Sequence, residues 1–484
     1  MKAQGPGQVA NGTRNWRRPL ARWFTVMCVP VLVIGLAACG TRSPSGDAHV
    51  GSAPAAYHPA PPAVSGHGVR ALWQGAPWGG LIVAGGLVLG IDDQGGRAVV
   101  RAVSALTGKY TWATPVPGTR QQVLSLVAGE GIVVVAAGHD VGTPPAMVAP
   151  VVTEDIVLDI ATGRQLWTVP VPGRIQAPPI AIAAGGIVLS GSPSGQITAR
   201  RARTGQFVWQ RQRSPQCPAT RVVTLGDEGM SLAADGSLLT ASFECQGGHV
   251  LVQRLTPATG QPAWQWISPG TSQAGEQAIL SLAGAARLGG LVLLAGQIVP
   301  TAAAQALAGS VPRSFAWPAS LGPLDGIEAV LALSADTGRP RWMELGGQQQ
   351  SFSLADGAVC ESVGAGLECR DDVTGSPSRP VLLTGQPSGA SPPYGDDGTV
   401  GISGSVAAMT VAPFRAGQVR LVVVPVHGTR QVAQASLAIG TTAYHANYQT
   451  FVVAAGPLPD GGTLFLLRRV DAPGYPVIAF AVTG

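Results

Sequence analysis

A short motif recurs along this chain and limits its fold more than any other feature. A Thr-Gly pair is followed, four residues after the glycine, by a tryptophan at five places. Seven Thr-Gly pairs have a residue at that offset, and with 11 tryptophans in 484 residues about 0.16 matches are expected by chance. Such self-similarity indicates a repeat architecture. The five tryptophans are Trp112, Trp167, Trp209, Trp264 and Trp342.

A second series of short apolar segments is independent of the first. These segments follow glycines 86, 131, 186, 236, 290, 357 and 398, which gives an average interval of 52 residues. Short β-branched and aliphatic runs bounded by Gly, Pro and Asp are typical of β-strands. The composition agrees, because 66 Gly and 40 Pro accompany only 12% charged residues.

Four-stranded sheets that repeat at this period are characteristic of propeller blades. The expected fold is therefore all-β, a β-propeller of four-stranded blades with eight blades, seven being the alternative, over residues 70–484. A single small sheet cannot bury both faces alone, whereas neighbouring blades bury each other. We expect the five repeat tryptophans to pack between adjacent blades.

The repeats also carry a family resemblance. The segment from Ala332 to Trp342 has the form Ala-x-x-Ala-x-Thr-Gly-x-x-x-Trp, which resembles the pyrroloquinoline quinone (PQQ)-type β-propeller repeat. The resemblance implies a propeller, often of eight blades. It is poor for function, because that family includes quinoprotein dehydrogenases, non-catalytic lipoproteins such as the outer-membrane protein assembly component, and sensor domains.

The first 38 residues have the layout of a secretory signal peptide. A basic stretch through Arg22 precedes an apolar run, and Leu36-Ala37-Ala38-Cys39-Gly40 resembles the bacterial lipobox. Cys39 is therefore the expected lipid attachment site, carrying a diacylglyceryl group and, as is usual for such anchors, palmitate. Residues 39–69 are rich in Ser, Pro, Ala and Gly and are expected to form a flexible tether. These features predict a protein anchored to the cell membrane on its extracytoplasmic face.

The net charge of +5 comes from this leader. The leader holds five basic and no acidic residues, so the remainder has 26 of each. A nucleic-acid-binding surface requires a local excess of Lys and Arg. We therefore expect no nucleic-acid partner.

Four cysteines remain in the predicted mature body, and an exported protein can form disulfides. Four cysteines allow three pairings. The pairs Cys217 with Cys245 and Cys360 with Cys369 are favoured, because the second pair flanks a short Gly-rich turn as in a hairpin. The alternative is four free buried thiols.

No catalytic residue, metal ligand or cofactor is predicted. The quinoprotein relatives often have adjacent cysteines and hold Ca²⁺ with a Glu, Asn and Asp set, and neither feature can be matched here. The histidines show no metal-ligand spacing. A quinone-dependent dehydrogenase is kept as the enzymatic alternative.

One long segment breaks the repeat period and carries aromatic residues. It spans residues 297–326 and includes Phe315 and Trp317, which we take as a candidate partner-binding loop. The predicted function is a non-catalytic scaffold that binds an unknown protein partner, or a ligand sensor. An outer-membrane protein assembly component is the second alternative.

Overall fold

The computed structural model describes residues between 64 and 482, and the leader, Cys39 and most of the tether lie outside the described residues. The chain divides into two units, Met1–Asp47 and Ala48–Gly484, and everything described belongs to the second. The described ranges are 64–75, 78–94, 97–117, 121–139, 151–175, 180–192, 195–215, 217, 230–235, 238–245, 249–268, 277–286, 290–299, 311–312, 314–316, 327–345, 353–355, 358–363, 366–371, 374–376, 381–382, 401–403, 405–411, 418–426, 433–438, 450–469 and 477–482.

Within these ranges the regular structure is entirely β-strand, arranged in eight sheets that we number I to VIII. Sheet I contains β3 (Gly79–Ala84), β4 (Leu87–Asp93), β5 (Ala98–Ser104) and β6 (Tyr110–Pro115). Sheet II contains β7 (Gln121–Gly129), β8 (Ile132–His139), β9 (Val151–Asp159) and β10 (Gln165–Ile175). Sheet III contains β11 (Ile180–Ala183), β12 (Ile187–Gly191), β13 (Ile197–Arg201) and β14 (Phe207–Arg211). Sheet IV contains β15 (Met230–Asp235), β16 (Leu238–Cys245), β17 (His249–Leu255) and β18 (Pro262–Ile267).

The remaining four sheets include the strands that come from outside the simple repeat. Sheet V contains β19 (Gln277–Ala286), β20 (Leu291–Val299), β22 (Ile327–Ser334), β23 (Pro340–Leu345) and, beyond β23, β21 (Ser314–Ala316). Sheet VI contains β24 (Ser353–Ala355), β25 (Ala358–Val363), β26 (Gly366–Asp371) and β27 (Val381–Leu382). Sheet VII contains β28 (Gly401–Ser403), β29 (Val406–Val411), β30 (Gln418–Pro425), β31 (Ala433–Ala438) and β1 (Val64–His67). Sheet VIII contains β32 (Thr450–Pro457), β33 (Thr463–Arg469), β34 (Val477–Val482) and β2 (Val69–Gly75).

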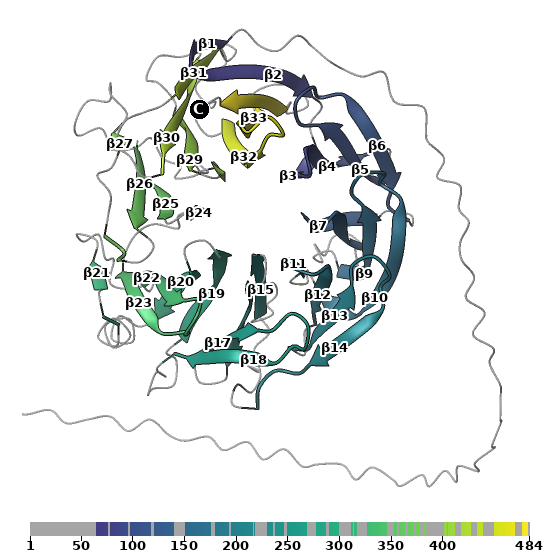
Figure 1. Cartoon of the computed structure of the whole chain (residues 1–484), viewed down its shortest axis with the longest axis vertical. Helices are drawn as coiled ribbons and strands as arrows, with labels where there is room; N and C mark the ends of the chain where they lie inside the picture. The colour runs from purple at the N-terminus through teal and green to yellow at the C-terminus, as the bar shows by residue number, and fades with distance from the viewer. Residues whose placement is uncertain are drawn as a thin grey trace, which may run out of the picture. The chain divides into compact units, whose positions relative to one another are not determined.

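Successive sheets lie next to one another in chain order (Figure 1). The first strands make this order plain, because β3 contacts β7, β7 contacts β11, and the series continues through β15, β19, β24 and β28 to β32. Strand β32 also contacts β3. Antiparallel sheets that pack in this way form a β-propeller, so the predicted fold class is confirmed, while the blade number stays a prediction.

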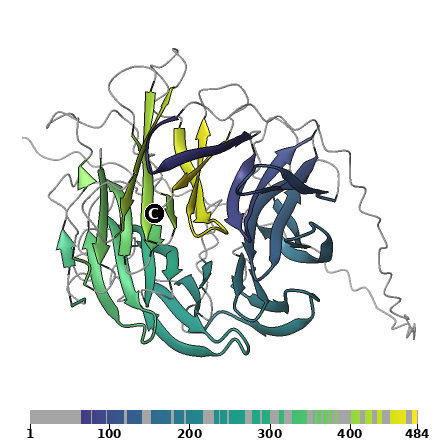
Figure 2. The same cartoon turned by 45° about the horizontal axis from the view of Figure 1, so that its top comes forward.

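The N-terminal strands complete the two C-terminal sheets. Strand β1 pairs antiparallel with β31, and β2 pairs antiparallel with β34. In Figure 2 the purple strand β2 lies beside the yellow strands of sheet VIII. The predicted tether boundary at residue 69 is therefore too late, because strand structure already begins at Val64. Strand β1 is held by backbone pairing with β31, which does not require an apolar sequence. Its sequence, Val-Ser-Gly-His, therefore has no pattern that would predict a strand.

The hydrophobic core is distributed among the interfaces between neighbouring sheets. One cluster joins Leu189, Ile197 and Trp209 of sheet III to Phe243 and Leu251 of sheet IV. Another joins Leu89, Val100 and Trp112 of sheet I to Val133 and Ile156 of sheet II. Each sheet therefore buries its faces against its neighbours.

Candidate functional site

In sheets I to VI the Thr-Gly motif lies in the turn between the third and fourth strands. In sheet I the Gly108 N–H donates to the Ser104 carbonyl (2.8 Å), and the Ser104 N–H donates to the Lys109 carbonyl (2.9 Å). The Thr107 hydroxyl accepts a hydrogen bond from the Lys109 N–H (3.3 Å). Gly108 has a φ of 65°, in the left-handed region that favours glycine. Both residues of the motif therefore contribute to the turn itself.

Four of the five repeat tryptophans pack on the Thr-Gly turn of the following repeat. A β-carbon built on Gly260 of sheet IV would lie 2.6 Å from the indole ring of Trp209 in sheet III. The same close approach joins Trp112 to Gly163, Trp167 to Gly205 and Trp264 to Gly338. Trp342 instead joins a buried cluster that includes Val359 of sheet VI. All five tryptophans therefore lie at boundaries between sheets.

The indole N–H groups fix the same boundary by hydrogen bonding. Four of them donate to a backbone carbonyl in the next turn, at 2.7 to 2.8 Å. The pairs are Trp112 with Ile160, Trp167 with Ala202, Trp209 with Pro257 and Trp264 with Ala335. The tryptophans thus have a structural role, and their polar groups are satisfied by the fold.

A sixth tryptophan, which the repeat motif does not identify, has the same role. Trp73 of β2 packs on Gly108 and donates its indole N–H to the Ala105 carbonyl (2.8 Å). It follows no Thr-Gly pair, because β2 is the fourth strand of a sheet whose other strands come from the C-terminal end of the chain. One signal could have identified Trp73: the first Thr-Gly turn, like the later ones, is expected to pack against a tryptophan from the preceding sheet.

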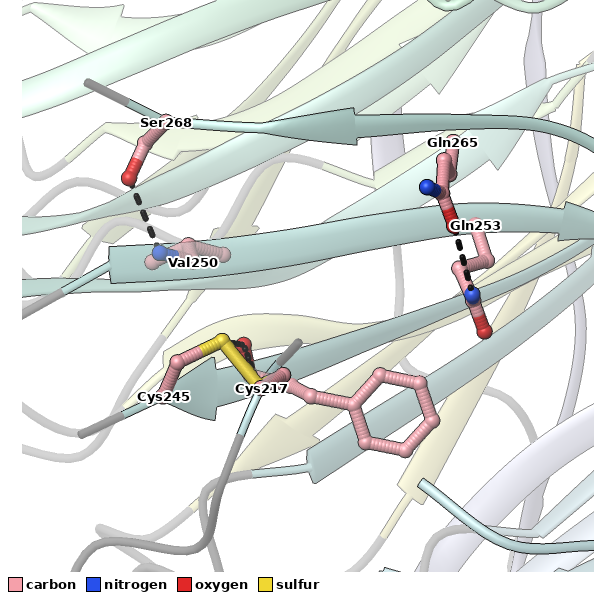
Figure 3. Close-up of a disulfide and its surroundings, with 7 residues drawn as sticks. Cys217, Cys245, Val250, Gln253, Gln265 and Ser268 are labelled. Carbon is pink, nitrogen blue, oxygen red and sulfur yellow. Dashed lines mark hydrogen bonds between the residues drawn. A yellow bond between two sulfur atoms is a disulfide. The ribbon is translucent and has the colours of Figure 1, made fainter. Parts of the chain in front are cut away.

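Both favoured disulfides are present. Cys217 bonds to Cys245 and Cys360 bonds to Cys369. Cys360 and Cys369 lie directly opposite each other on β25 and β26, as expected for a hairpin. Cys217 lies after β14 and is joined to the end of β16 (Figure 3), which ties the connection between sheets III and IV to sheet IV.

The candidate partner loop is only partly described. Ser314–Ala316 form β21, which pairs in parallel with β23, so this part of the segment is an edge strand rather than a loop. Phe315 is the register partner of Glu344. Trp317 lies outside the described residues. This strand could not be predicted from the sequence, because three residues are too few to show an alternating pattern.

Two buried polar features stand at sheet boundaries. Glu344 of sheet V accepts a hydrogen bond from Arg370 of sheet VI at 2.7 Å, and both side chains are buried.

Asp155 of β9 is 2% exposed, and its burial raises the pKa of the carboxyl to about 7. A hydrogen bond to Ser190 and the charge of Arg200 lower that pKa but do not offset the burial. Both contacts come from sheet III, so Asp155 belongs to the boundary between sheets II and III.

The residues that the structure describes contain no group of three or more His, Cys, Asp or Glu placed to hold a metal ion. In the same ranges, no helix is long and apolar enough to cross a membrane.

The fold and its Thr-Gly-Trp repeats define a class, the PQQ-like repeat β-propellers. The family model described as outer membrane protein assembly factor BamB matches residues 9–265, which is more than half of the chain. The chain belongs to this family.

Two curated relatives carry the same description. The protein from Vibrio cholerae serotype O1 is 34% identical over 116 residues, covering 23% of this chain and 28% of the relative. The protein from Burkholderia pseudomallei is 35% identical over 103 residues, covering 21% of this chain and 24% of the relative. The matched part of this chain therefore spans only about a quarter of each curated relative.

Solved structures with a similar fold include BamB from Moraxella catarrhalis, with a TM-score of 0.48, 14% identity and coverage of 87% of this chain and 100% of that structure. They also include a quinohemoprotein alcohol dehydrogenase from Comamonas testosteroni, with a TM-score of 0.46, 14% identity and coverage of 86% and 77%. Likeness at this level does not choose between a binding protein and an enzyme.

Proposed function

We propose that this protein is an exported lipoprotein, anchored through Cys39, whose β-propeller is a non-catalytic scaffold for a protein partner. The observation that carries the proposal is the family match over residues 9–265, since that family is described by a protein assembly factor. The lipobox at Leu36–Gly40 supports the anchor, and the cystine pairs suit an extracytoplasmic location.

A more specific form of this proposal is a role in the assembly of outer-membrane proteins. The two curated relatives favour it, because both are described as outer membrane protein assembly factors. This form requires a cell with an outer membrane, which fractionation of the source cells would establish.

The proposal is tested by cross-linking intact cells and recovering the full-length lipoprotein. A stoichiometric protein partner is expected in the wild type. A Cys39→Ala variant should remain unprocessed and without lipid, and normal lipidation of that variant would refute the anchor. Recovery of the wild type with no protein partner would refute the scaffold and favour a ligand sensor.

The enzymatic alternative has its own test. A quinone-dependent dehydrogenase would show bound-quinone absorbance and Ca²⁺-dependent dye reduction in the folded protein. We expect neither, and observing both would replace the scaffold proposal.

A further inference from the structure

Sheet V shows what can occupy the outer edge of a blade in this molecule. Strand β21 pairs in parallel with β23, and its residues Ser314, Phe315 and Ala316 are the register partners of Met343, Glu344 and Leu345. These three positions directly follow the repeat tryptophan, Trp342. Extended chain is therefore accepted at the outer edge just after this tryptophan.

The outer strands of the four preceding sheets differ at the third residue after the repeat tryptophan. The third residue after the tryptophan is Pro115 in sheet I and Pro170 in sheet II. Proline lacks an N–H and protects a sheet edge from pairing. In sheet III, β14 ends at Arg211, only two residues after Trp209. In sheet IV the third residue is Ile267, still within β18.

Ile267 presents both its side chain and its backbone at this edge. Its side chain is 38% exposed, and only Phe207 is a more exposed large hydrophobic residue among those described. The N–H of the next residue, Ser268, donates to the Val250 carbonyl of β17 (2.9 Å), and Figure 3 shows the Ser268 hydroxyl bound to the Val250 N–H. Because successive residues of an antiparallel strand alternate in direction, the Ile267 N–H and C=O point away from β17.

The charge pattern of β18 also fits pairing. Pro262–Ile267 contains no charged residue, whereas protected edges usually carry Lys or other charges. Within the described ranges, the strand order of sheet IV ends at β18. A charged residue of a partner would lose hydration on binding β18 and would gain no opposite charge in return, so an uncharged partner segment is favoured.

We propose that the outer edge of β18 binds an extended, uncharged segment of the protein partner by strand addition, centred on Ile267. The inference rests on the proposed scaffold function and specifies its surface. Strand addition takes affinity from backbone hydrogen bonds and specificity from alternate side chains. A second copy of this chain is a poorer occupant, because two six-residue edges bury far less than the roughly 1,200 Å² of a stable interface.

The test places the photo-cross-linking residue p-benzoyl-phenylalanine at position 267 of the full-length chain in its own cells, with position 115 as the matched control. The expected result is a light-dependent adduct to another protein from position 267 only, with the linked sites confined to one extended segment. Adducts only to this chain, no adduct, or equal adducts from both positions would overturn the inference.

A pair of charge variants separates this inference from the proposed function. Ile267→Lys should reduce recovery of the partner at least tenfold, while Pro115→Lys leaves it unchanged and both variants keep the wild-type unfolding midpoint. In the wild-type complex, amide exchange at residue 267 should slow. If the partner is recovered undiminished with Ile267→Lys, the β18 inference is wrong and the scaffold proposal stands.

Discussion

Trp209 of sheet III and Gly260 of sheet IV fit together so closely that neither tolerates a change of size. The glycine has a φ of 68°, and a β-carbon built on it would meet the indole ring at 2.6 Å. The indole N–H continues into the same turn and donates to the Pro257 carbonyl (2.7 Å). One residue pair therefore joins two neighbouring sheets by packing and by a hydrogen bond.

Truncating this tryptophan should destabilise the propeller. Trp209→Ala removes a side chain that is 8% exposed and leaves a cavity in the boundary, which is expected to cost about 3–5 kcal/mol of unfolding free energy. Urea unfolding followed by circular dichroism measures the change. Phe207→Ala on the same strand is the control, because Phe207 is 52% exposed and should change stability by less than about 0.5 kcal/mol. Equal effects of the two variants would contradict the packing role.

Much of this boundary could be predicted from the sequence, because the Thr-Gly-Trp spacing records a local turn and the residue that faces the next repeat. Trp73 could not be found in this way, since its sheet is assembled from both ends of the chain. The Glu344–Arg370 pair also could not be predicted, because the two residues meet across a sheet boundary and no sequence spacing indicates the contact. Ile267 gave no signal either, since edge exposure depends on which strands pair.

Replacing the turn glycine should separate backbone strain from steric overlap. Gly260→Ala introduces a β-carbon that both disfavours the positive φ and collides with Trp209, with an expected loss of about 2–5 kcal/mol. Gly185→Ala is the matched control, because Gly185 has a φ of 79° but no atom within 4 Å of the added carbon. It should lose only about 1–2 kcal/mol. Calorimetric unfolding of both variants compares the cost of backbone strain with the cost of steric overlap. A control that loses as much stability as Gly260→Ala would argue against steric overlap.

Removing each disulfide should destabilise the protein according to the loop it closes. The Cys217–Cys245 bond spans 28 residues and the Cys360–Cys369 bond spans 9. The chain-entropy argument gives about 3.5 kcal/mol for the longer loop and about 2.5–3 kcal/mol for the shorter one. Paired Cys→Ala variants of each bond, unfolded in urea without reductant, measure both losses. A larger loss for the 9-residue loop would show that native packing, and not loop closure, dominates.

The buried carboxyl of Asp155 should make stability depend on pH. Its pKa rises from 3.8 to about 7 on folding, chiefly because burial disfavours the charged form. A folded-state pKa above the unfolded value favours the folded state fully below about pH 3.8, and this contribution is lost as pH rises through about 7. The wild type should therefore lose up to roughly 4 kcal/mol of relative stability between pH 4 and pH 8 from this group alone.

Asp155→Asn removes the titration while keeping a side chain that can bond to Ser190. The variant should show a flatter stability profile across this range and should be more stable than the wild type at pH 8. Denaturant unfolding at a series of pH values measures both profiles. Asp460→Asn, at an exposed turn residue, is the matched acid-to-amide control. Parallel profiles for Asp155→Asn and the wild type would show that Arg200 already neutralises the buried charge, so that Asp155 is ionised in the folded protein throughout.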